Sequence, residues 1–599
     1  MKSFLRVFKL VSKGTRFLYA MVFIVTIIAT FFSLLTTFLS KVVVDALSHE
    51  LDKAEFIEQL IVNILTNSQG NDYLYDHLWI LPFAIVMNAA ATAFLFWLRV
   101  YLRASCSSII NYNLQTILYE QIEHLPYETF KDQKSGDLIQ TCTRDIDLMR
   151  RFAVMNLSTM AQTVTTVIFC FIILLEIDPK LAFVSFATIP FLFIYSFFMI
   201  RLVKYRYRLA DDAEGEVVDA ISSNLNGARI IKAYNEEVNQ IALFKEKLSY
   251  YRECYQKHTI ASAFFYASSD IFIFLSRTLS LVYAIYLAYT KEATSGTIFL
   301  AFTFVNMIVW PLRNMATNLA NLGQTMAGCD RICKLLDLPK EDLDIGNNDV
   351  INGDITFENV SFGYPDNPTK LVLKNVSFTL KKGQTAAFFG KTGAGKSSLF
   401  ALLCHLYDNY TGRILIDGKD IREFSLRSLR SQVLPVLQDP FLFSMSLKEN
   451  IEAVSKQASE EDLRHVIEMA GLKSTIEGFQ EGFGTKVGEK GVTLSGGQRQ
   501  RIAIARALLA APPILLLDDS LSAVDMETDH LIRQNLAKEK GKHTVLMITH
   551  RIASAKDADV IIVLNRGEIA EIGTHEELIQ GNGLYAQIAH IQEIVKGGV

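Results

Sequence analysis

The sequence predicts a membrane domain of six long α-helices, followed by an α/β domain that contains a P-loop. Three observations support this fold class. The mean hydropathy of the 599 residues is +0.23, which is high for a soluble chain. Apolar stretches of about 20 residues, the length that crosses a bilayer, recur in the first half of the chain. The second half contains alternating strand-like segments and a glycine-rich turn.

The membrane domain is predicted from six apolar stretches. They lie near residues 17–44, 78–103, 157–177, 180–202, 260–289 and 296–318. Two long gaps, at about 104–156 and 203–259, are charged and have a helical pattern. Long gaps with many Lys and Arg residues belong on the cytosolic side of a membrane. The sequence therefore predicts a multi-pass membrane protein with its N- and C-termini in the cytosol.

An acidic segment at 46–77 separates the first two stretches and is expected to face outside. Its middle, FIEQLIVNIL, has helical periodicity. We interpret it as a surface helix that caps the outer end of the bundle. A role in partner docking or substrate gating is the alternative.

The composition changes after residue 338. A polar linker, LPKEDLDIGNNDVINGD, precedes the strand-like segments DITFENVSFGYP and LVLKNVSFTL. We therefore expect a membrane domain over 1–338 and a nucleotide-binding domain over 339–599. The formal net charge of −4 lacks the basic surplus of a nucleic-acid-binding protein. The seven cysteines have no metal or disulfide spacing, so we interpret them as free thiols.

A phosphate-binding loop is predicted at GKTGAGKSS, residues 390–398. Gly390, Gly395, Lys396 and Ser397 satisfy the pattern G-x-x-x-x-G-K-[ST] after the strand-like TAAFF. Backbone N–H groups of such a loop surround phosphate, Lys396 would neutralise it, and Ser397 would bind Mg²⁺. The remaining loop residues in the predicted site are Lys391, Thr392, Gly393, Ala394 and Ser398.

An acidic strand completes the predicted nucleotide site. The apolar segment ILLL runs into Asp518, which would hold Mg²⁺ through water. The P-loop and this strand together predict binding of ATP with Mg²⁺.

The segment LSGGQ at 494–498 precedes that strand. With the P-loop, it makes the chain resemble an ABC transporter half of the exporter kind, in which six membrane helices of domain-swapped type precede one ATPase domain. In this family ATP lies between two ATPase domains, one supplying the P-loop and the other the signature LSGGQ. The resemblance therefore implies a second half-transporter chain as partner, because this chain carries one ATPase domain.

The resemblance also implies roles for single residues. Tyr364 would stack on adenine, Gln438 would contact Mg²⁺, and His550 would sense the γ-phosphate. Asp525 would cross the dimer interface. The signature residues Ser495, Gly496, Gly497 and Gln498 would offer hydroxyl and N–H groups to the γ-phosphate of the partner's ATP.

Asp519 departs from the family pattern. Active members usually have glutamate there, which polarises the attacking water, and Asp519 is shorter by one methylene, roughly 1.5 Å. The chain thus resembles the degenerate-site subunit of a bacterial heterodimeric exporter, with a partner that carries the catalytic glutamate. The alternative is a homodimer in which Asp519 is the working base.

Two cytosolic segments, YETFKDQ (127–133) and ARIIKAYNEE (228–237), are expected by resemblance to contact the ATPase domains. Within the membrane, Asp270 and Arg277 fall on one helix face, as an ion pair or as a cargo contact. Asn306, Trp310 and Asn314 form a second polar stripe, and Asn88 and Trp97 are weaker candidates.

The predicted function is ATP-driven export of amphipathic small molecules, of multidrug type, across a bacterial plasma membrane. The expected partners are a second half-transporter, membrane lipid and the cargo, without nucleic acid. Transport of lipids, peptides or siderophores is an alternative. A different class is an ATP-gated channel or regulatory subunit, in which Asp519 would make ATP a slow switch.

Overall fold

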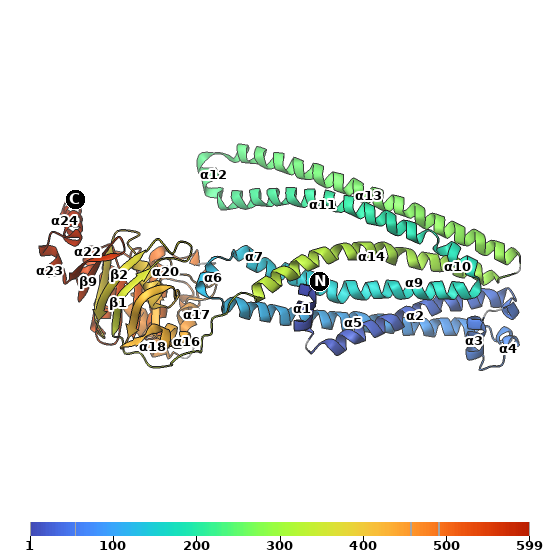
Figure 1. Cartoon of the computed structure of the whole chain (residues 1–599), viewed down its shortest axis with the longest axis horizontal. Coiled ribbons are helices and arrows are strands. Elements are labelled where there is room, and N and C mark those ends of the chain that lie inside the picture. Colours follow the sequence, from blue (N-terminus) through green and yellow to red (C-terminus); the bar gives the residue numbers. More distant parts are fainter. Residues whose placement is uncertain are drawn as a thin grey trace. The chain divides into compact units, whose positions relative to one another are not determined.

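The chain folds into two compact units in a computed structural model (Figure 1). The structure describes residues 2–12, 14–53, 56–290, 292–455, 458–488 and 491–597. The first unit comprises Met1–Glu123 and Lys134–Leu338, and the second comprises His124–Gln133 and Pro339–Val599. A short segment from the N-terminal half therefore belongs to the second unit.

The first unit is built from long helices. The longest are α2 (Arg16–Leu47), α5 (Ile80–Glu123), α9 (Leu157–Ile177), α11 (Ile189–Asn226), α13 (Glu237–Tyr289) and α14 (Ser295–Leu336). Shorter helices are α1 (Lys2–Val11), α3 (Phe56–Leu65), α4 (Asn71–Asp76), α7 (Ser135–Gln140), α8 (Ile146–Arg150) and α10 (Pro179–Phe186). Two π-helical turns, Thr141–Asp145 and Arg151–Asn156, flank α8.

Five helical segments are long and apolar enough to cross a membrane. They are Arg16–Leu47, Ile80–Glu123, Ser135–Ile177, Pro179–Asn226 and Glu237–Tyr289, and they match the first five predicted stretches, the second of which starts two residues before its helix. The sixth prediction falls on α14, where Ser295–Ile308 is a shorter apolar helix among the described residues. Sequence hydropathy therefore located the helices, which also continue well beyond the apolar stretches.

Helices α11 and α13 form a two-helix arm with α12 (Ala228–Tyr234) at its tip, drawn in green in Figure 1. They pack mainly on each other and diverge from α9 and α14 toward α12. The tip contains the predicted segment 228–237. Its exposed apolar side chains are Leu225, Ile230, Tyr234, Val238 and Ile241. Exposed apolar surfaces of this kind are typical of sites that contact another protein or a membrane.

Polar side chains join neighbouring membrane helices. Arg277 on α13 donates to the amide oxygen of Asn306 on α14, and its guanidinium lies 5.3 Å from the ring centre of Phe302. The sequence placed Arg277 and Asn306 in two separate polar sets, whereas the fold brings them together. Asn88 on α5 donates to Thr36 on α2 at 2.7 Å. The side chain of Trp310 lies outside the described residues.

The segment FIEQLIVNIL forms helix α3, as its periodicity predicts. Its first turn is fixed by buried charges: Glu58 pairs with Lys41 of α2, and Lys41 Nζ lies 3.5 Å from Asp45. All three side chains are fully buried. Asp45 also accepts from Thr294 Oγ1 at 2.9 Å, ahead of α14. Removing one member of such a buried network leaves an uncompensated charge, so it fixes α3 on the bundle.

The second unit contains two β-sheets. The four-stranded sheet has the order β2-β1-β4-β5, and the six-stranded sheet has the order β10-β9-β3-β8-β7-β6. The strands are β1 (Ile355–Phe362), β2 (Leu373–Leu380), β3 (Thr385–Gly390), β4 (Tyr410–Ile416), β5 (Lys419–Asp420), β6 (Val433–Val436), β7 (Ile514–Asp518), β8 (Thr544–Ile548), β9 (Val560–Asn565) and β10 (Glu568–Gly573). Strands β9, β3, β8, β7 and β6 are parallel, as buried apolar runs predict.

Helices surround these sheets and complete three hydrophobic cores. They are α6 (Tyr127–Lys131), α15 (Lys396–Leu403), α16 (Leu426–Gln432), α17 (Leu447–Ile451), α18 (Glu460–Met469), α19 (Lys473–Glu477), α20 (Gly496–Leu509), α21 (Met526–Lys538), α22 (Ile552–Ala555), α23 (His575–Gln580) and α24 (Leu584–Gly597). One core lies between the two sheets and α15. A second joins α17, α18 and α20 to the opposite face of β7 and β8. The smallest packs β3 and β9 against α22 and α24.

Candidate functional site

The predicted nucleotide residues follow four adjacent parallel strands. The P-loop follows β3, Asp518 ends β7, Gln438 lies two residues after β6, and His550 lies two residues after β8. Parallel neighbours direct their carboxyl ends to the same edge of a sheet, which is where ligands bind in α/β folds. The sheet topology therefore gathers residues that are more than a hundred positions apart in sequence.

The P-loop begins and ends with glycines in left-handed backbone conformations. Gly390 has φ +148° and Gly395, the residue before α15, has φ +101°. A Cβ at Gly390 would lie 2.3 Å from the Leu564 carbonyl oxygen. The loop needs glycine at these positions because other residues would be strained or would clash.

Lys396 is buried at the start of α15 and points back into the loop. Its Nζ donates to the carbonyl oxygens of Gly390 at 2.8 Å and Lys391 at 3.1 Å. Burial lowers the pKa of Lys396, and the carboxylates of Asp518 and Asp519 oppose that shift. The ammonium group is thus held where the loop would bring phosphate.

Ser397 and Asp518 form the predicted magnesium site. Ser397 Oγ donates to Asp518 Oδ1 at 3.2 Å. Burial raises the pKa of Asp518, and the neighbouring charge of Asp519 adds to the rise. A hydroxyl and a carboxylate are oxygen ligands of the type that Mg²⁺ takes, together with waters and substrate phosphates. These residues fit Mg²⁺, which would neutralise charge on the bound phosphates.

Asp519 is held by its backbone and by Gln438. It has φ +45°, and its N–H donates to the Ile548 carbonyl at 3.1 Å. Gln438 Nε2 lies 3.4 Å from Asp519 Oδ2, so the proposed magnesium contact and the proposed base touch. The main chain of Asp519 is therefore fixed, and the length of its side chain decides how far the carboxylate reaches.

The side chain of His550 is exposed and lies near Lys396, Asp518 and Asp519. Partial loss of hydration lowers the pKa of His550, and the charge of Lys396 lowers it further. The carboxylates of Asp519 and Asp518 oppose this shift. A neutral imidazole at pH 7 has one N–H donor and one acceptor. The predicted γ-phosphate sensor could therefore donate one hydrogen bond without adding a charge.

Tyr364 lies next to the P-loop helix and next to α6. Its hydroxyl is 2.9 Å from Ser398 Oγ. Lys131 of α6 lies 5.4 Å from the ring centre of Tyr364 and 3.7 Å from Asp366. The predicted contact of segment 127–133 with the nucleotide-binding domain is thus present within the second unit. No pattern in the sequence predicted the cation–π contact between Lys131 and Tyr364.

The signature residues cap helix α20. Ser495 Oγ accepts from Gln498 N at 3.2 Å, and Ser495 N donates to Gln498 Oε1 at 2.8 Å, which forms a capping box. Gly497 lies close to Ala523, where a Cβ would be 2.8 Å from the carbonyl oxygen. Gly496 and Gly497 thus allow the start of α20 to approach the loop before Asp525. Their N–H groups stay at the positive end of the helix.

Asp525 caps the next helix, α21. Its carboxylate accepts from Thr528 N at 2.9 Å, and this bond holds the pKa of Asp525 below its usual range. The predicted interface residue is therefore also a helix cap, and it would reach a partner through the exposed side of the loop.

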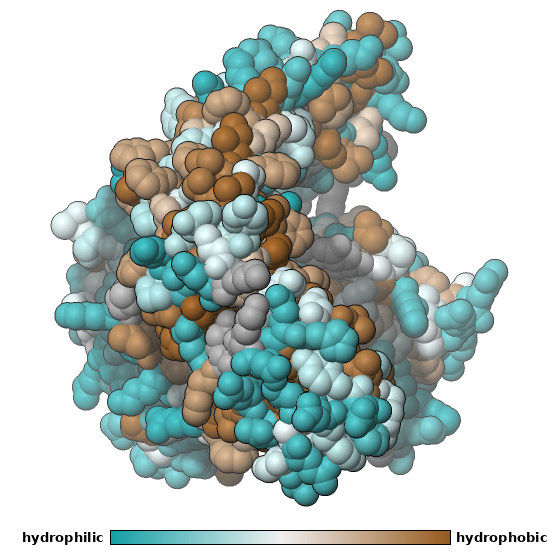
Figure 2. All heavy atoms as spheres, turned by 90° about the vertical axis from the view of Figure 1, so that its right-hand side faces the viewer, coloured by the Kyte–Doolittle hydropathy of each residue, from teal (hydrophilic) through white to brown (hydrophobic). Residues whose placement is uncertain are grey.

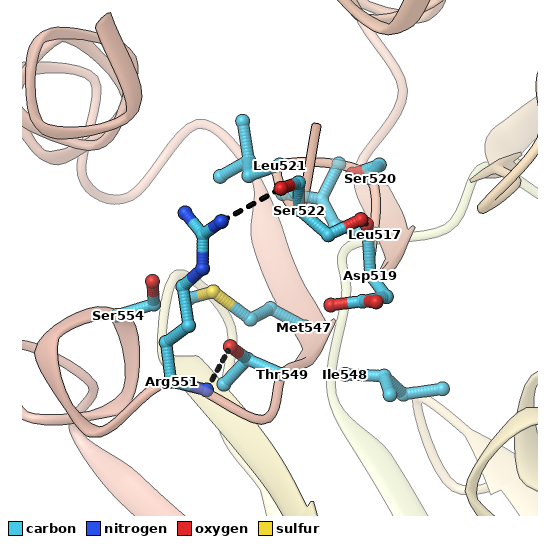
Figure 3. Close-up of a pocket in the computed structure, with 10 residues that line it drawn as sticks. All are labelled: Leu517, Asp519, Ser520, Leu521, Ser522, Met547, Ile548, Thr549, Arg551 and Ser554. Atoms are coloured by element: carbon cyan, nitrogen blue, oxygen red, sulfur yellow. Dashed lines mark hydrogen bonds between the residues drawn. The ribbon is translucent and has the colours of Figure 1, made fainter. Parts of the chain in front are cut away.

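Arg551 connects the histidine loop to the Asp525 loop, and the sequence analysis missed it (Figure 3). Its Nη2 donates to the Ser522 carbonyl at 2.7 Å, and its N–H donates to Thr549 Oγ1 at 3.1 Å. Asp519 lines the same small pocket. The available signal was the position of Arg551 directly after His550, but its contact across the loops required the fold.

Gly395→Ala is expected to impair both stability and ATP binding. The new Cβ would lie 2.7 Å from Leu373 Cδ2 and 2.9 Å from the Val372 carbonyl oxygen, at φ +101°. Strain of this kind costs about 1–3 kcal/mol. The measurement is the thermal unfolding midpoint of the purified protein, with and without MgATP.

Gly418→Ala is the matched control, because Gly418 has φ +79° but no atom within 4 Å of the added Cβ. The Gly395 variant should have the lower midpoint and the smaller MgATP-induced rise. Equal behaviour of the two variants would show that the close packing of Gly395 does not matter.

Comparison with known proteins agrees with this arrangement. Residues 373–522 match the family "ABC transporter", and residues 19–312 match the "ABC transporter transmembrane region". The "Uncharacterized ABC transporter ATP-binding protein YknU" of Bacillus subtilis is 34% identical over 491 residues, covering 80% of this chain and 83% of that protein. The "Putative multidrug export ATP-binding/permease protein YgaD" of the same organism is 32% identical over 500 residues, covering 83% and 86%.

A solved structure of a bacterial Atm1-family ABC exporter with ATP bound has the same fold, with a TM-score of 0.78 and 23% identity. The match covers 97% of this chain and 99% of that chain. The helical membrane unit, the P-loop site and these relatives lead to one conclusion: the chain belongs to the ABC transporters, and it couples an ATPase domain to transport across a membrane.

Proposed function

We propose that this chain is one half of a heterodimeric exporter that moves amphipathic small molecules outward across a bacterial plasma membrane, with both termini in the cytosol. Its own P-loop site binds MgATP and hydrolyses it slowly. The single observation that carries the proposal is Asp519, an aspartate where the family resemblance leads us to expect glutamate.

The need for a partner is supported by the position of the signature. The hydrogen bonds described for Ser495 and Gln498 join them to each other, whereas Lys396, Ser397 and Asp518 form a separate group. The exposed Ser495 and the half-buried Gly496 and Gly497 at the start of α20 would thus face a phosphate that another chain holds. The exposed apolar tip around α12 is a second surface that a partner would cover.

An asymmetric pair is supported by the combination of an intact signature with a shortened base. The signature would complete the partner's site, where the partner supplies its own P-loop and a glutamate. The site on this chain's P-loop keeps Lys396, Ser397 and Asp518, so ATP binding would persist while water activation is weak. A misplacement of about 1 Å can cost on the order of 100-fold in rate.

The proposed cargo class is supported by the relatives and by the membrane helices. One relative carries the words multidrug export in its name. Aromatic side chains are abundant on the membrane helices, and rings of this kind suit amphipathic molecules with an apolar body. ATP-dependent uptake of a lipophilic dye into inside-out vesicles tests this class. A current that follows the electrochemical gradient, without uptake against it, would instead indicate a channel.

Native mass spectrometry of the chain, purified from its own membranes, is expected to give a complex with one different chain. The reason is that a homodimer would have Asp519 as the base at both sites, and both sites would then hydrolyse ATP slowly. A homodimer would have twice the mass of 67.4 kDa, or about 135 kDa. A clean homodimer that hydrolyses ATP rapidly would overturn the heterodimer and make Asp519 the working base at both sites.

A further inference from the structure

A large apolar cavity lies beneath helix α3, apart from the nucleotide site. Its volume is about 730 Å³. Helices α2, α5 and α9 form its walls, and α3 forms the fourth side. The lining includes Phe31 and Phe38 of α2, Ile61 and Leu65 of α3, Met87 of α5 and Ile172 of α9. Small-molecule pockets have volumes of roughly 300–1,000 Å³, so this α3 cavity has the size of a ligand site.

The lining is almost free of polar groups. Of the described residues that line the α3 cavity, Asn88 alone is polar. Its Nδ2 already donates to the Phe32 carbonyl at 2.9 Å and to Thr36 Oγ1 at 2.7 Å. A ligand with a charged or strongly polar group would lose its hydration without gaining a partner. The cavity therefore selects a hydrocarbon chain.

Helix α3 has apolar side chains on more than one face. Val62 is buried in the core of the membrane unit, whereas Phe56 and Ile64 are 75% and 70% exposed. Leu60 and Ile64 are exposed and also line the α3 cavity. The cavity is thus continuous with the apolar outer face of α3. Helices with such faces lie at the boundary between lipid headgroups and acyl chains.

The position of α3 over the cavity is fixed by polar contacts at its first turn. Glu58 pairs with Lys41 of α2, and Ile57 N donates to Glu176 Oε1 of α9 at 3.0 Å. Helix α3 is therefore anchored by polar contacts to α2 and α9, two of the three helices that form the cavity walls. Figure 2 faces the end of the membrane unit that carries α3 and α4, where hydrophobic side chains reach the surface among hydrophilic ones.

We propose that the α3 cavity binds one fatty acyl chain of a membrane phospholipid. Three features of the cavity match this occupant: its walls are helices that cross the membrane, its lining is apolar, and its opening continues onto the apolar face of α3. The bound chain would fill the space between α3 and the bundle. This proposal is independent of the cargo and of the second transporter chain.

The test uses the purified full-length transporter in vesicles of phosphatidylethanolamine and phosphatidylglycerol, with a photoreactive diazirine on one acyl chain of the phosphatidylglycerol. After irradiation, peptides that contain residues 31–39, 57–65 and 84–91 should carry the label. Ala91→Trp fills the cavity from α5 and should lower labelling of the 57–65 peptide by about tenfold.

Ala90→Trp is the matched control, since Ala90 is exposed on the same helix and does not line the cavity. Ala84→Trp repeats the test from a second lining position if the Ala91 variant does not fold. Equal labelling of the 57–65 peptide in the filled and control variants would overturn the proposal. Loss of the label on addition of a lipophilic dye at micromolar concentration would assign the cavity to cargo instead.

Discussion

Asp519→Glu is expected to raise ATP hydrolysis at this chain's own site by about 100-fold. The extra methylene extends the carboxylate by roughly 1.5 Å. The backbone at this position is fixed, because its N–H donates to the Ile548 carbonyl at 3.1 Å. The longer side chain would therefore bring the carboxylate closer to the place where the γ-phosphate of ATP would bind, without moving the loop. The measurement is single-turnover hydrolysis in the purified transporter, with the partner's catalytic residue replaced.

Asp519→Asn is the control for this prediction. It keeps the size of the side chain and the contact region of Gln438, which lies 3.4 Å away, but it removes the negative charge. We expect no increase and a further loss of the residual rate. If Asp519→Glu leaves the rate unchanged, the length of the base does not limit this site. A fast wild-type rate at both sites would favour the homodimer.

Lys396→Ala is expected to weaken MgATP binding at this site by about 30-fold or more, since truncating one partner of a buried charge pair costs about 2–5 kcal/mol. Lys396 is buried and its Nζ is held by two loop carbonyl oxygens at 2.8 and 3.1 Å. When ATP binds, charged phosphate oxygens would replace these neutral carbonyl oxygens as acceptors for Lys396. An alanine side chain has no group that can donate to phosphate. The measurement is the Kd for MgATP with the partner's P-loop lysine also replaced.

Lys391→Ala is the matched control because it removes the same charge from the same loop. The Lys391 side chain is exposed, so its attraction to phosphate is screened by solvent, and we expect at most about a fivefold change. If both variants weaken binding equally, the net charge of the loop decides affinity. In that case the buried position of Lys396 would not matter.

The sequence predicted those parts of the fold that depend on local patterns. The helix α3 follows from the periodicity of FIEQLIVNIL, and strand β7 follows from the run ILLL before Asp518. The P-loop was found because the glycines, the lysine and the serine are close together in the chain. Its nearness to Asp518 then followed from the motif order, since both elements belong to one parallel sheet.

The sequence did not predict the contacts between segments that are distant along the chain. The pairing of Arg277 with Asn306 depends on how α13 and α14 face each other. The contact of Lys131 with Tyr364 depends on where α6 docks, which no periodicity encodes. The two π-helical turns around α8 also had no signal, because their residues have an ordinary helical pattern. For the two side-chain contacts, the sequence showed the residue types but not the residues with which they pair.

The arm formed by α11, α12 and α13 bears on how the cell would control the amount of this protein. In the proposed heterodimer with cytosolic termini, a copy without its partner would expose Leu225, Ile230 and Tyr234 to the cytosol. Exposed apolar side chains at the end of a long, weakly supported helical pair are recognised by chaperones and proteases, which remove chains in proportion to the time they spend uncovered. Assembly would hide this tip. If the chain works in the proposed heterodimer, its cellular level would be limited by the supply of the partner, even when its own synthesis is in excess.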